Sequence, residues 1–302
     1  MTGIARKAVP YGWCPTAYRP MMADDGYLVR VRPHLARLTA EQVQGLCDLA
    51  ITHGNGGIEF TIRSNLQLRG VTEAAHAPLL NGLAALGLLD PDAAFEHRRN
   101  IVTTPFWAAD DLSVQVHDAL MAGIAALPEL PAKVGFGIDC GDMRVLHDAS
   151  ADFRFERGAA GGLILRADGA PAGPVVTPET AVDALTQMAQ WFLDTGGATA
   201  GRMARHLPSA TLPTDWMTEA PATTAPPPAL GSHEQGLICA APAGAHEAAA
   251  LKSLMQRTGA PGLRTTPWRV FVLETPRDAT LVDPAHPWEE PDPIHLAETS
   301  TP

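Results

Sequence analysis

The stretch Thr61-Ile62-Arg63-Ser64-Asn65-Leu66-Gln67-Leu68-Arg69-Gly70-Val71 alternates polar and apolar side chains at its centre. On a β-strand, side chains two residues apart point to the same face. Arg63, Asn65, Gln67 and Arg69 would therefore place two guanidinium groups and two amides on one face of a sheet. Burying such a face costs free energy unless polar or anionic groups meet it. The stretch thus predicts either a solvent-exposed sheet face or a binding site for an anion.

The residues around this stretch predict a small α+β unit. Tyr27–Arg32 (YLVRVR) and Ile58–Ile62 alternate in the manner of half-buried strands. Between them, Thr39–Gln42 has the pattern of a capping box that opens a helix, and Gly54 is suited to end that helix in a left-handed cap. Glu73–Gly87 predicts a second helix. This order of elements is typical of half of a ferredoxin-like fold.

The same order recurs near the other end of the chain. Gly236–Ala241 predicts an apolar strand, Ala245–Thr258 a helix and Trp268–Glu274 another strand. Two copies indicate a pseudo-twofold protein whose halves pair with each other. The alternative is chance recurrence of a common strand–helix–strand unit.

The middle of the chain predicts a separate sheet followed by a helix. Candidate strands are Lys133–Asp139, Asp152–Glu156 and Leu163–Arg166, separated by glycine-rich turns. Thr177-Pro178-Glu179 has the residues that open a helix, namely a threonine cap and a proline at the first helical position. Gly196-Gly197 is expected to end it.

Two segments have the composition of irregular structure. Pro208–Ser232 is dominated by Pro, Ala and Thr and predicts a poorly ordered linker. Pro276–Pro302 is proline-rich and acidic and predicts a flexible tail.

The overall composition narrows the class of protein. The chain has 302 residues, of which 46% are hydrophobic, so a folded protein is expected. No apolar run approaches the roughly 20 residues needed to cross a bilayer, which predicts a cytoplasmic protein without a membrane partner. The net charge of −11 argues against a general nucleic-acid binder. The four cysteines lie far apart and form no C-x-x-C pair, so no metal site is predicted.

Further basic residues follow the first unit. Arg98-Arg99-Asn100 precedes Ile101-Val102, and Lys133 opens a predicted strand. Arginine offers a two-pronged fork for carboxylates and other oxyanions, and lysine offers a compact charge. Together these residues could clamp an anion, although each is also ordinary on a protein surface.

Several motifs, read in order, resemble those of precorrin-3B synthase, a family within the sirohaem- and [4Fe–4S]-dependent nitrite/sulfite reductase superfamily. The similar motifs are Gly12-Trp13-Cys14-Pro15, Arg19-Pro20-Met21, Gly26–Arg32, Arg63–Val71, Arg98–Val102, Trp191-Phe192-Leu193 and Thr266-Pro267-Trp268-Arg269. The resemblance extends from about Gly12 to Asp283.

The resemblance implies an α+β fold in which two pseudo-symmetric ferredoxin-like half-domains pair around a sulfite-reductase-type α+β domain. The implied boundaries are 12–90 for the first half-domain, 95–207 for the sulfite-reductase-type domain, 208–232 for the linker, 233–275 for the second half-domain and 276–302 for the tail.

The resemblance also implies site residues. Arg63, Arg99 and Lys133 would be the catalytic contacts to the substrate anion. The implied tetrapyrrole contacts are Arg63, Asn65, Gln67, Arg69, Arg98 and Asn100, and no residue is assigned to a metal. In the sulfite reductases two lysines follow a Leu-Pro pair; here Lys133 supplies the first, whereas the second position holds Gly135. This departure counts against sulfite reduction.

The implied function is oxygen-dependent hydroxylation of precorrin-3A in cobalamin biosynthesis, by an oxidoreductase of the monooxygenase type. A sirohaem-like tetrapyrrole would be bound, either as cofactor or as substrate. The [4Fe–4S] cluster of the family lacks its ligands, because no cysteine follows Cys239, so we expect the cluster-binding lobe to be absent and a partner chain or homodimer to cover its place. The alternatives are a non-catalytic tetrapyrrole-binding or scaffold protein and, last, a sulfite/nitrite reductase remnant.

Overall fold

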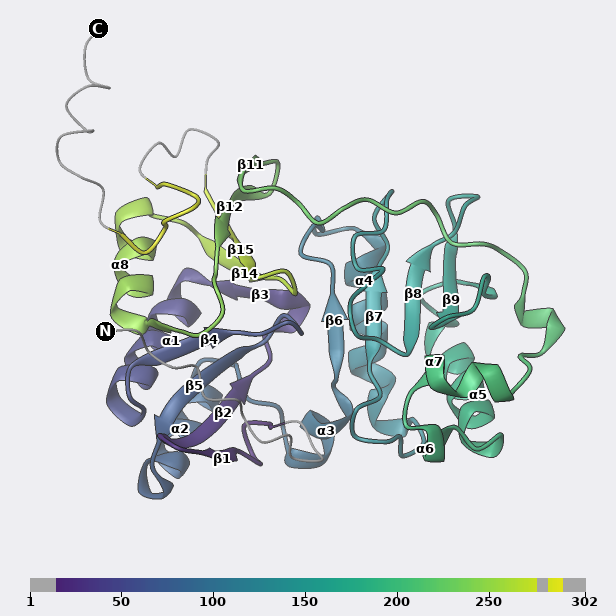
Figure 1. Cartoon of the computed structure of the whole chain (residues 1–302), viewed down its shortest axis with the longest axis horizontal. Coiled ribbons are helices and arrows are strands. Elements are labelled where there is room, and N and C mark those ends of the chain that lie inside the picture. Colours follow the sequence, from purple (N-terminus) through teal and green to yellow (C-terminus); the bar gives the residue numbers. More distant parts are fainter. Residues whose placement is uncertain (1–14, 276–281, 290–302) are drawn as a thin grey trace, which may run out of the picture. The chain divides into compact units, whose positions relative to one another are not determined.

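The computed structural model describes residues 15–275 and 282–289, and their fold is α+β with three five-stranded sheets (Figure 1). The chain divides into two compact units. Unit 1 contains Ala17–Leu89 and the described residues from Pro228 onward, and unit 2 contains Asp90–Pro227. None of the helices among the described residues combines the length and the apolar character needed to span a membrane.

Sheet A of unit 1 is antiparallel and has the strand order β1-β2-β5-β4-β13. Its strands are β1 (Met21–Ala23), β2 (Gly26–Val31), β5 (Leu66–Val71), β4 (Gly57–Phe60) and β13 (Ala245–Glu247). Sheet B has the order β11-β12-β15-β14-β3. Its strands are β11 (Gly231–His233), β12 (Gly236–Ala240), β15 (Val270–Glu274), β14 (Gly262–Thr265) and β3 (Arg37–Thr39).

The two sheets are completed by a reciprocal exchange of edge strands. Strand β3, from the first half of the chain, pairs with β14 of the second half, and the two lie side by side in Figure 1. Strand β13, from the second half, pairs with β4 of the first half. Each half thus supplies the last strand of the other half's sheet. The predicted α+β class with two related half-domains is confirmed.

The helices of unit 1 are α1 (Ala40–His53), α2 (Glu73–Ala85) and α8 (Ala248–Thr258). Two of them, α1 and α8, follow the exchanged strands β3 and β13, and α2 follows β5, the central strand of sheet A. The predicted capping box is present, since Gln42 N donates to Thr39 Oγ1 over 3.2 Å and Thr39 N donates to Gln42 Oε1 over 3.0 Å. The left-handed cap predicted at Gly54 was wrong: φ is −119°. Glycine is needed there because a Cβ would lie 2.5 Å from the carbonyl oxygen of Arg69.

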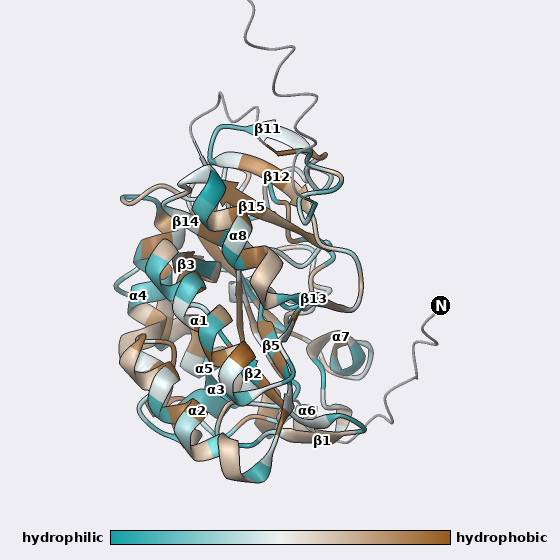
Figure 2. Ribbon diagram, turned by 90° about the vertical axis from the view of Figure 1, so that its left-hand side faces the viewer, coloured by the Kyte–Doolittle hydropathy of each residue, from teal (hydrophilic) through white to brown (hydrophobic). Residues whose placement is uncertain are grey.

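One hydrophobic core serves both sheets of unit 1. Val29 and Phe60 of sheet A, Phe271 of sheet B, and Leu46 and Leu251 of the helices all belong to it. The rings of Phe60 and Phe271 stack with centroids 5.4 Å apart. Figure 2 shows brown and teal residues on the same helices, as expected of elements with one buried face. Each fully buried side chain of this size contributes about 1.5–3 kcal/mol, so the halves are held together mainly by this core.

Part of the predicted flexible tail packs on unit 1. Trp288 stacks on His246, with ring centroids 4.1 Å apart and planes at 14°, and Pro284 O accepts a hydrogen bond from Ala240 N over 2.8 Å. Arg257 Nη2 donates to Pro287 O over 2.5 Å. The prediction was therefore wrong for Val282–Glu289, and the rest of the predicted tail lies outside the described residues.

Unit 2 contains sheet C, of order β10-β9-β8-β7-β6. Strands β6, β7 and β8 are parallel, and β8, β9 and β10 are antiparallel. The strands are β6 (Ile101–Thr103), β7 (Phe136–Asp139), β8 (Phe153–Arg157), β9 (Leu163–Ala167) and β10 (Val175–Val176), and the helices are α3 (Ala93–Arg98), α4 (Leu112–Gly123), α5 (Ala181–Asp194), α6 (Gly197–Ala200) and α7 (Met203–His206). Residues of α4 and α5 share a second hydrophobic core with this sheet.

Two predictions for unit 2 are corrected. Helix α5 starts at Ala181 rather than at the Thr177-Pro178-Glu179 motif, because Thr180 N donates to Thr177 O and closes a turn there. The segment predicted as a poorly ordered linker makes backbone bridges within unit 2, pairing Glu219 with Gly173, Pro221 with Gly158 and Thr224 with Arg144. These backbone bridges order the segment, although its sequence shows no periodic pattern of apolar side chains.

Candidate functional site

A row of polar side chains crosses sheet A on the face opposite the core. This polar row consists of Arg30, Gln67 and Glu59, which are direct neighbours on β2, β5 and β4. Arg30 Nη2 donates to Gln67 Oε1 over 2.6 Å, and Gln67 Nε2 donates to Glu59 Oε2 over 3.0 Å. Gln67 is 7% exposed. The amide of Gln67 is thus buried and oriented by its neighbours on both sides.

Arg69 lies on the same strand and is paired within the chain. Its Nε and Nη2 donate to the two carboxylate oxygens of Asp25 over 3.2 and 3.0 Å, and its Nη1 lies 3.6 Å from Glu59 Oε2. Burial alone would raise the pKa of Asp25, but the hydrogen bonds and charge of Arg69 outweigh it and lower that pKa. Arg69 therefore has a carboxylate of its own in this structure.

Arg63 and Asn65 lie in the turn between β4 and β5, not on a strand. Thr61 Oγ1 accepts hydrogen bonds from Arg63 N (3.3 Å) and Asn65 N (3.1 Å), and Thr61 N donates to Asn65 O (2.9 Å). Ser64, between them, has φ 54°. The prediction that all four polar residues share one strand face was wrong for Arg63 and Asn65, because the left-handed residue at Ser64 turns the chain. Only Gln67 and Arg69 lie on β5.

The other predicted site residues belong to unit 2 and lie at the end of α3 and before β7. Arg99 is buried and its Nε donates to both carboxylate oxygens of Asp90, over 2.9 and 3.0 Å. Asn100 Nδ2 donates to Val134 O over 2.8 Å. Lys133 is exposed in the turn that leads into β7. Arg99 and Asn100 thus fix the local chain, while Lys133 offers its charge to solvent.

Arg98 lines a cavity of about 370 Å³ within unit 2. Its Nη1 donates to Leu127 O over 2.6 Å. The lining is largely apolar, with Leu130 and Phe136 among its residues, and Glu129 brings one carboxylate. The cavity is large enough for part of an organic ligand.

The structure explains the glycine at the second lysine position. A Cβ on Gly135 would lie 2.8 Å from Asn100 Nδ2 and 2.9 Å from Asn100 O. Gly135 N also donates to Asp152 Oδ2 over 3.0 Å, which holds the backbone in place. A lysine therefore does not fit here without moving the chain.

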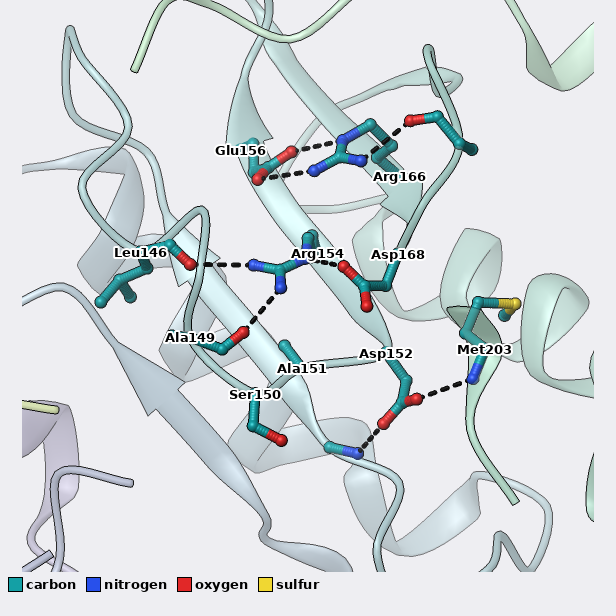
Figure 3. A network of polar contacts seen from close by, with 12 residues as sticks. Leu146, Ala149, Ser150, Ala151, Asp152, Arg154, Glu156, Arg166, Asp168 and Met203 are labelled. Carbon is teal, nitrogen blue, oxygen red and sulfur yellow. Dashed lines mark hydrogen bonds and ion pairs between the residues drawn. The ribbon is translucent and has the colours of Figure 1, made fainter. Parts of the chain in front are cut away.

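A network of hydrogen bonds and ion pairs lies next to Gly135, centred on Asp152 and on Arg154 of β8 (Figure 3). Asp152 accepts hydrogen bonds from Gly135 N and, over 2.8 Å, from Met203 N. Arg154 donates to Asp168 over 2.6 Å and to the carbonyl oxygens of Leu146 and Ala149. Sequence analysis missed this network, although Phe153-Arg154-Phe155-Glu156 alternates as on a strand with one apolar and one charged face.

Two neighbouring acids of sheet C have opposite pKa shifts. Burial raises the pKa of Asp139 to about 7, and its Oδ1 has no hydrogen-bond partner among the described residues. Glu156 lies beside Asp139, on β8. Burial alone would raise the pKa of Glu156 too, but the hydrogen bonds and charges of Arg166 and Arg144 lower it below its ordinary value. Both side chains are almost fully buried, at 2% and 1% exposure, so neither is placed to meet a substrate from solvent.

The described residues do not fit an iron–sulfur cluster. Cys47, Cys140 and Cys239 are buried free thiols, and burial raises the pKa of each to about 12, whereas cluster ligation requires thiolates. Cys140 belongs to unit 2 and the other two to unit 1. Within the described ranges, no group of three His, Cys, Asp or Glu side chains could hold a metal ion.

Comparison with known proteins agrees with this architecture. Residues 19–86 match the family model of the nitrite/sulfite reductase ferredoxin-like half domain. A precorrin-3B synthase from Sinorhizobium sp. is 34% identical over 149 residues, covering 44% of this chain and 32% of the relative. A ferredoxin–nitrite reductase from Synechococcus elongatus is 26% identical over 155 residues, covering 47% of this chain and 30% of the relative. The chain thus spans about a third of the length of these relatives.

The fold has a solved counterpart. The structure of the Mycobacterium tuberculosis NirA protein matches with a TM-score of 0.68 at 19% identity, over 84% of this chain and 55% of that one. Unit 1 of the present structure contains the segment matched by the family model, with Arg63, Gln67 and Arg69 inside it. Residues 19–86 therefore match a nitrite/sulfite reductase ferredoxin-like half domain, and about half of the chain is similar in sequence to part of a precorrin-3B synthase and part of a ferredoxin–nitrite reductase.

Proposed function

We propose that this chain is a precorrin-3B synthase-like oxidoreductase of tetrapyrrole biosynthesis, which binds a reduced tetrapyrrole polycarboxylate for oxygen-dependent hydroxylation. The 34% identity to a precorrin-3B synthase supports this choice over the other relatives. The structural observation that carries it is the Thr61–Asn65 turn, which holds Arg63 in a fixed backbone geometry beside the polar row.

In this proposal the basic residues of the chain bind and orient the substrate. Arg63 would receive a substrate carboxylate through a two-pronged charge-assisted hydrogen bond. Because Thr61 already orders the backbone of the turn, the conformational entropy lost on binding is mainly that of the Arg63 side chain. Lys133 of unit 2 is exposed and stays a separate candidate for binding an anion. Arg69 and Arg99 are assigned to positioning, because each already pairs with an aspartate.

Sulfite or nitrite reduction is the less favoured function. By resemblance, that chemistry uses a second lysine where this chain has Gly135, and a Cβ at that position would collide with Asn100. A missing cation would leave a reducing oxyanion less stabilised. The geometry therefore favours a substrate whose charge is carried by peripheral carboxylates.

The test is a titration of the full chain with uroporphyrin III, an octacarboxylate tetrapyrrole, followed by conversion of precorrin-3A in air with added iron and a chemical electron donor, which supplies the two electrons that reduce the second oxygen atom to water. Arg63→Gln should weaken uroporphyrin binding about tenfold, the loss of one charge-assisted pair. Arg205→Gln, which removes an exposed charge of unit 2, is the matched control and should change nothing. Equal affinity of the wild type and Arg63→Gln would contradict the binding proposal, and binding without oxygen-dependent conversion would contradict the enzymatic one.

A further inference from the structure

Backbone strain in the described chain is concentrated around one buried hydroxyl. The non-glycine residues with positive φ are Leu35 (53°), Ala36 (55°), Ser64 (54°) and Arg269 (61°). Thr265, which is fully buried, directs its Oγ1 toward Ser64 O over 2.6 Å and toward Ala36 O over 3.2 Å. Arg269 follows in the next turn of the same hairpin. All four residues therefore surround the end of β14.

Strain of this kind points to function. Side chains other than glycine avoid the left-handed region, and where they remain in it they cluster at ligand clamps and active sites. Ser64 adds a second observation: its Oγ is buried and has no hydrogen-bond partner among the described residues. A turn needed only for chain reversal would favour glycine at these positions.

The β14–β15 turn is the structural counterpart of the β4–β5 turn that carries Arg63. Trp268 N donates to Thr266 Oγ1 over 3.3 Å, just as Arg63 N donates to Thr61 Oγ1 over 3.3 Å. Arg269 then adopts positive φ, as Ser64 does in the first turn. The bond from Thr265 to Ser64 O places the two turns side by side within unit 1.

We propose that Trp268 and Arg269 form, with Arg63, a two-turn clamp for a planar tetrapyrrole polycarboxylate. This inference rests on the proposed function and assigns new residues to its site. Arg269 is exposed and would bind a second carboxylate of the ligand that Arg63 holds, since the bond from Thr265 to Ser64 O joins the two turns. Trp268 is half-buried and would place its indole against the ring system.

The decisive variant is Arg269→Gly in the full chain, titrated with uroporphyrin III. Glycine adopts positive φ without strain, so the melting temperature should stay equal or rise. The Kd for uroporphyrin should nevertheless increase about tenfold, as for the loss of one charge-assisted pair. An unchanged Kd in this well-folded variant would overturn the assignment of Arg269. A fall in melting temperature would overturn the account of strain at this position.

Tryptophan variants test the other half of the clamp. Trp268→Phe keeps an aromatic face and should bind nearly as the wild type does, whereas Trp268→Ala should weaken binding and reduce the shift of the porphyrin absorption band. Equal binding by both variants would remove Trp268 from the site. If wild type and Arg63→Gln behave as proposed while the Arg269 and Trp268 variants bind normally, only the clamp fails. If the wild type binds no uroporphyrin, the binding function and the clamp fail together.

Discussion

Sheets A and B of unit 1 share a framework but differ on the faces turned away from their common core. Across sheet A, the neighbouring residues on β2, β5, β4 and β13 are Arg30, Gln67, Glu59 and Ala245. Across sheet B, the equivalent residues on β12, β15, β14 and β3 are Ile238, Val272, Arg264 and Arg37. The polar row at the centre of sheet A thus corresponds to a buried aliphatic pair in sheet B.

The difference shows how one framework separates two tasks. The inward residues of both sheets are apolar and maintain the core. Charge in sheet B is concentrated in one cluster, in which Glu274 accepts hydrogen bonds from Arg37 (2.9 and 2.7 Å) and Arg264 (2.6 Å). This cluster joins the exchanged strand β3 to its host sheet, so its task is structural. The polar row of sheet A lies in the half that carries Arg63.

Of the substitutions predicted here, removal of the Glu274 carboxylate in sheet B should lower the free energy of unfolding most. Glu274→Ala leaves Arg37 and Arg264 without their shared acceptor in a largely buried place, and should lower the free energy of unfolding by about 2–3 kcal/mol. Glu59→Ala in sheet A is the matched control and should cost only about 1 kcal/mol, because Glu59 is more exposed. Urea denaturation measures both. Equal losses would mean that the two sheets do not differ in the way described.

Replacing the central polar residue of sheet A by its aliphatic counterpart in sheet B should have an intermediate effect on the free energy of unfolding. Gln67→Val introduces the side chain that sheet B has at Val272, and it removes a hydrogen-bond partner of Arg30 and of Glu59. The free energy of unfolding should fall by about 1–2 kcal/mol, because two hydrogen bonds of the buried Gln67 amide are lost. Urea denaturation again provides the measurement. An unchanged or higher stability would show that the polar row contributes no structural order to sheet A.

The smallest effect concerns acid pH. Burial alone would raise the pKa of Glu274, but the hydrogen bonds from Arg37 and Arg264 lower it below the ordinary value of 4.5. Because the pKa is lower in the folded state, the stability from Glu274 is present above pH 4.5 and is lost as the pH falls through the folded value. Unfolding curves of Glu274→Gln should therefore vary less with pH below 4.5 than those of the wild type. Parallel curves would contradict this.

The sequence was sufficient for features with local causes. Alternating apolar residues located β2, β5 and β15, a continuous apolar run located β12, and the capping box located the start of α1. Strands β3 and β13 escaped prediction because each has three residues and exists only through a partner in the other half of the chain. The turn at Arg63 escaped because Ser64 adopts a conformation that its residue type rarely takes.

The sequence predicts which basic residues belong to the candidate site, but it does not predict which of them form ion pairs within the chain. Its basic residues follow from the motifs, yet the pairing of Arg69 with Asp25 joins β5 to the turn between β1 and β2. No periodicity relates these positions. The Trp268–Arg269 turn was recognised as a motif, but its relation to Arg63 depends on the hydrogen bond from Thr265. Contacts distant in sequence therefore decide which charges are neutralised.

The exchange of β3 and β13 has a consequence for biosynthesis. A ribosome releases β4 long before β13, and all of unit 2 is translated in between. At about 5–20 residues per second, the nascent first half waits for tens of seconds with the edge of β4 unpaired. Unpaired strand edges are templates for association with other chains. Cotranslational folding of this protein is therefore expected to leave an aggregation-prone intermediate that nascent-chain chaperones can recognise, and the vulnerable period ends only when Ala245–Glu247 emerges.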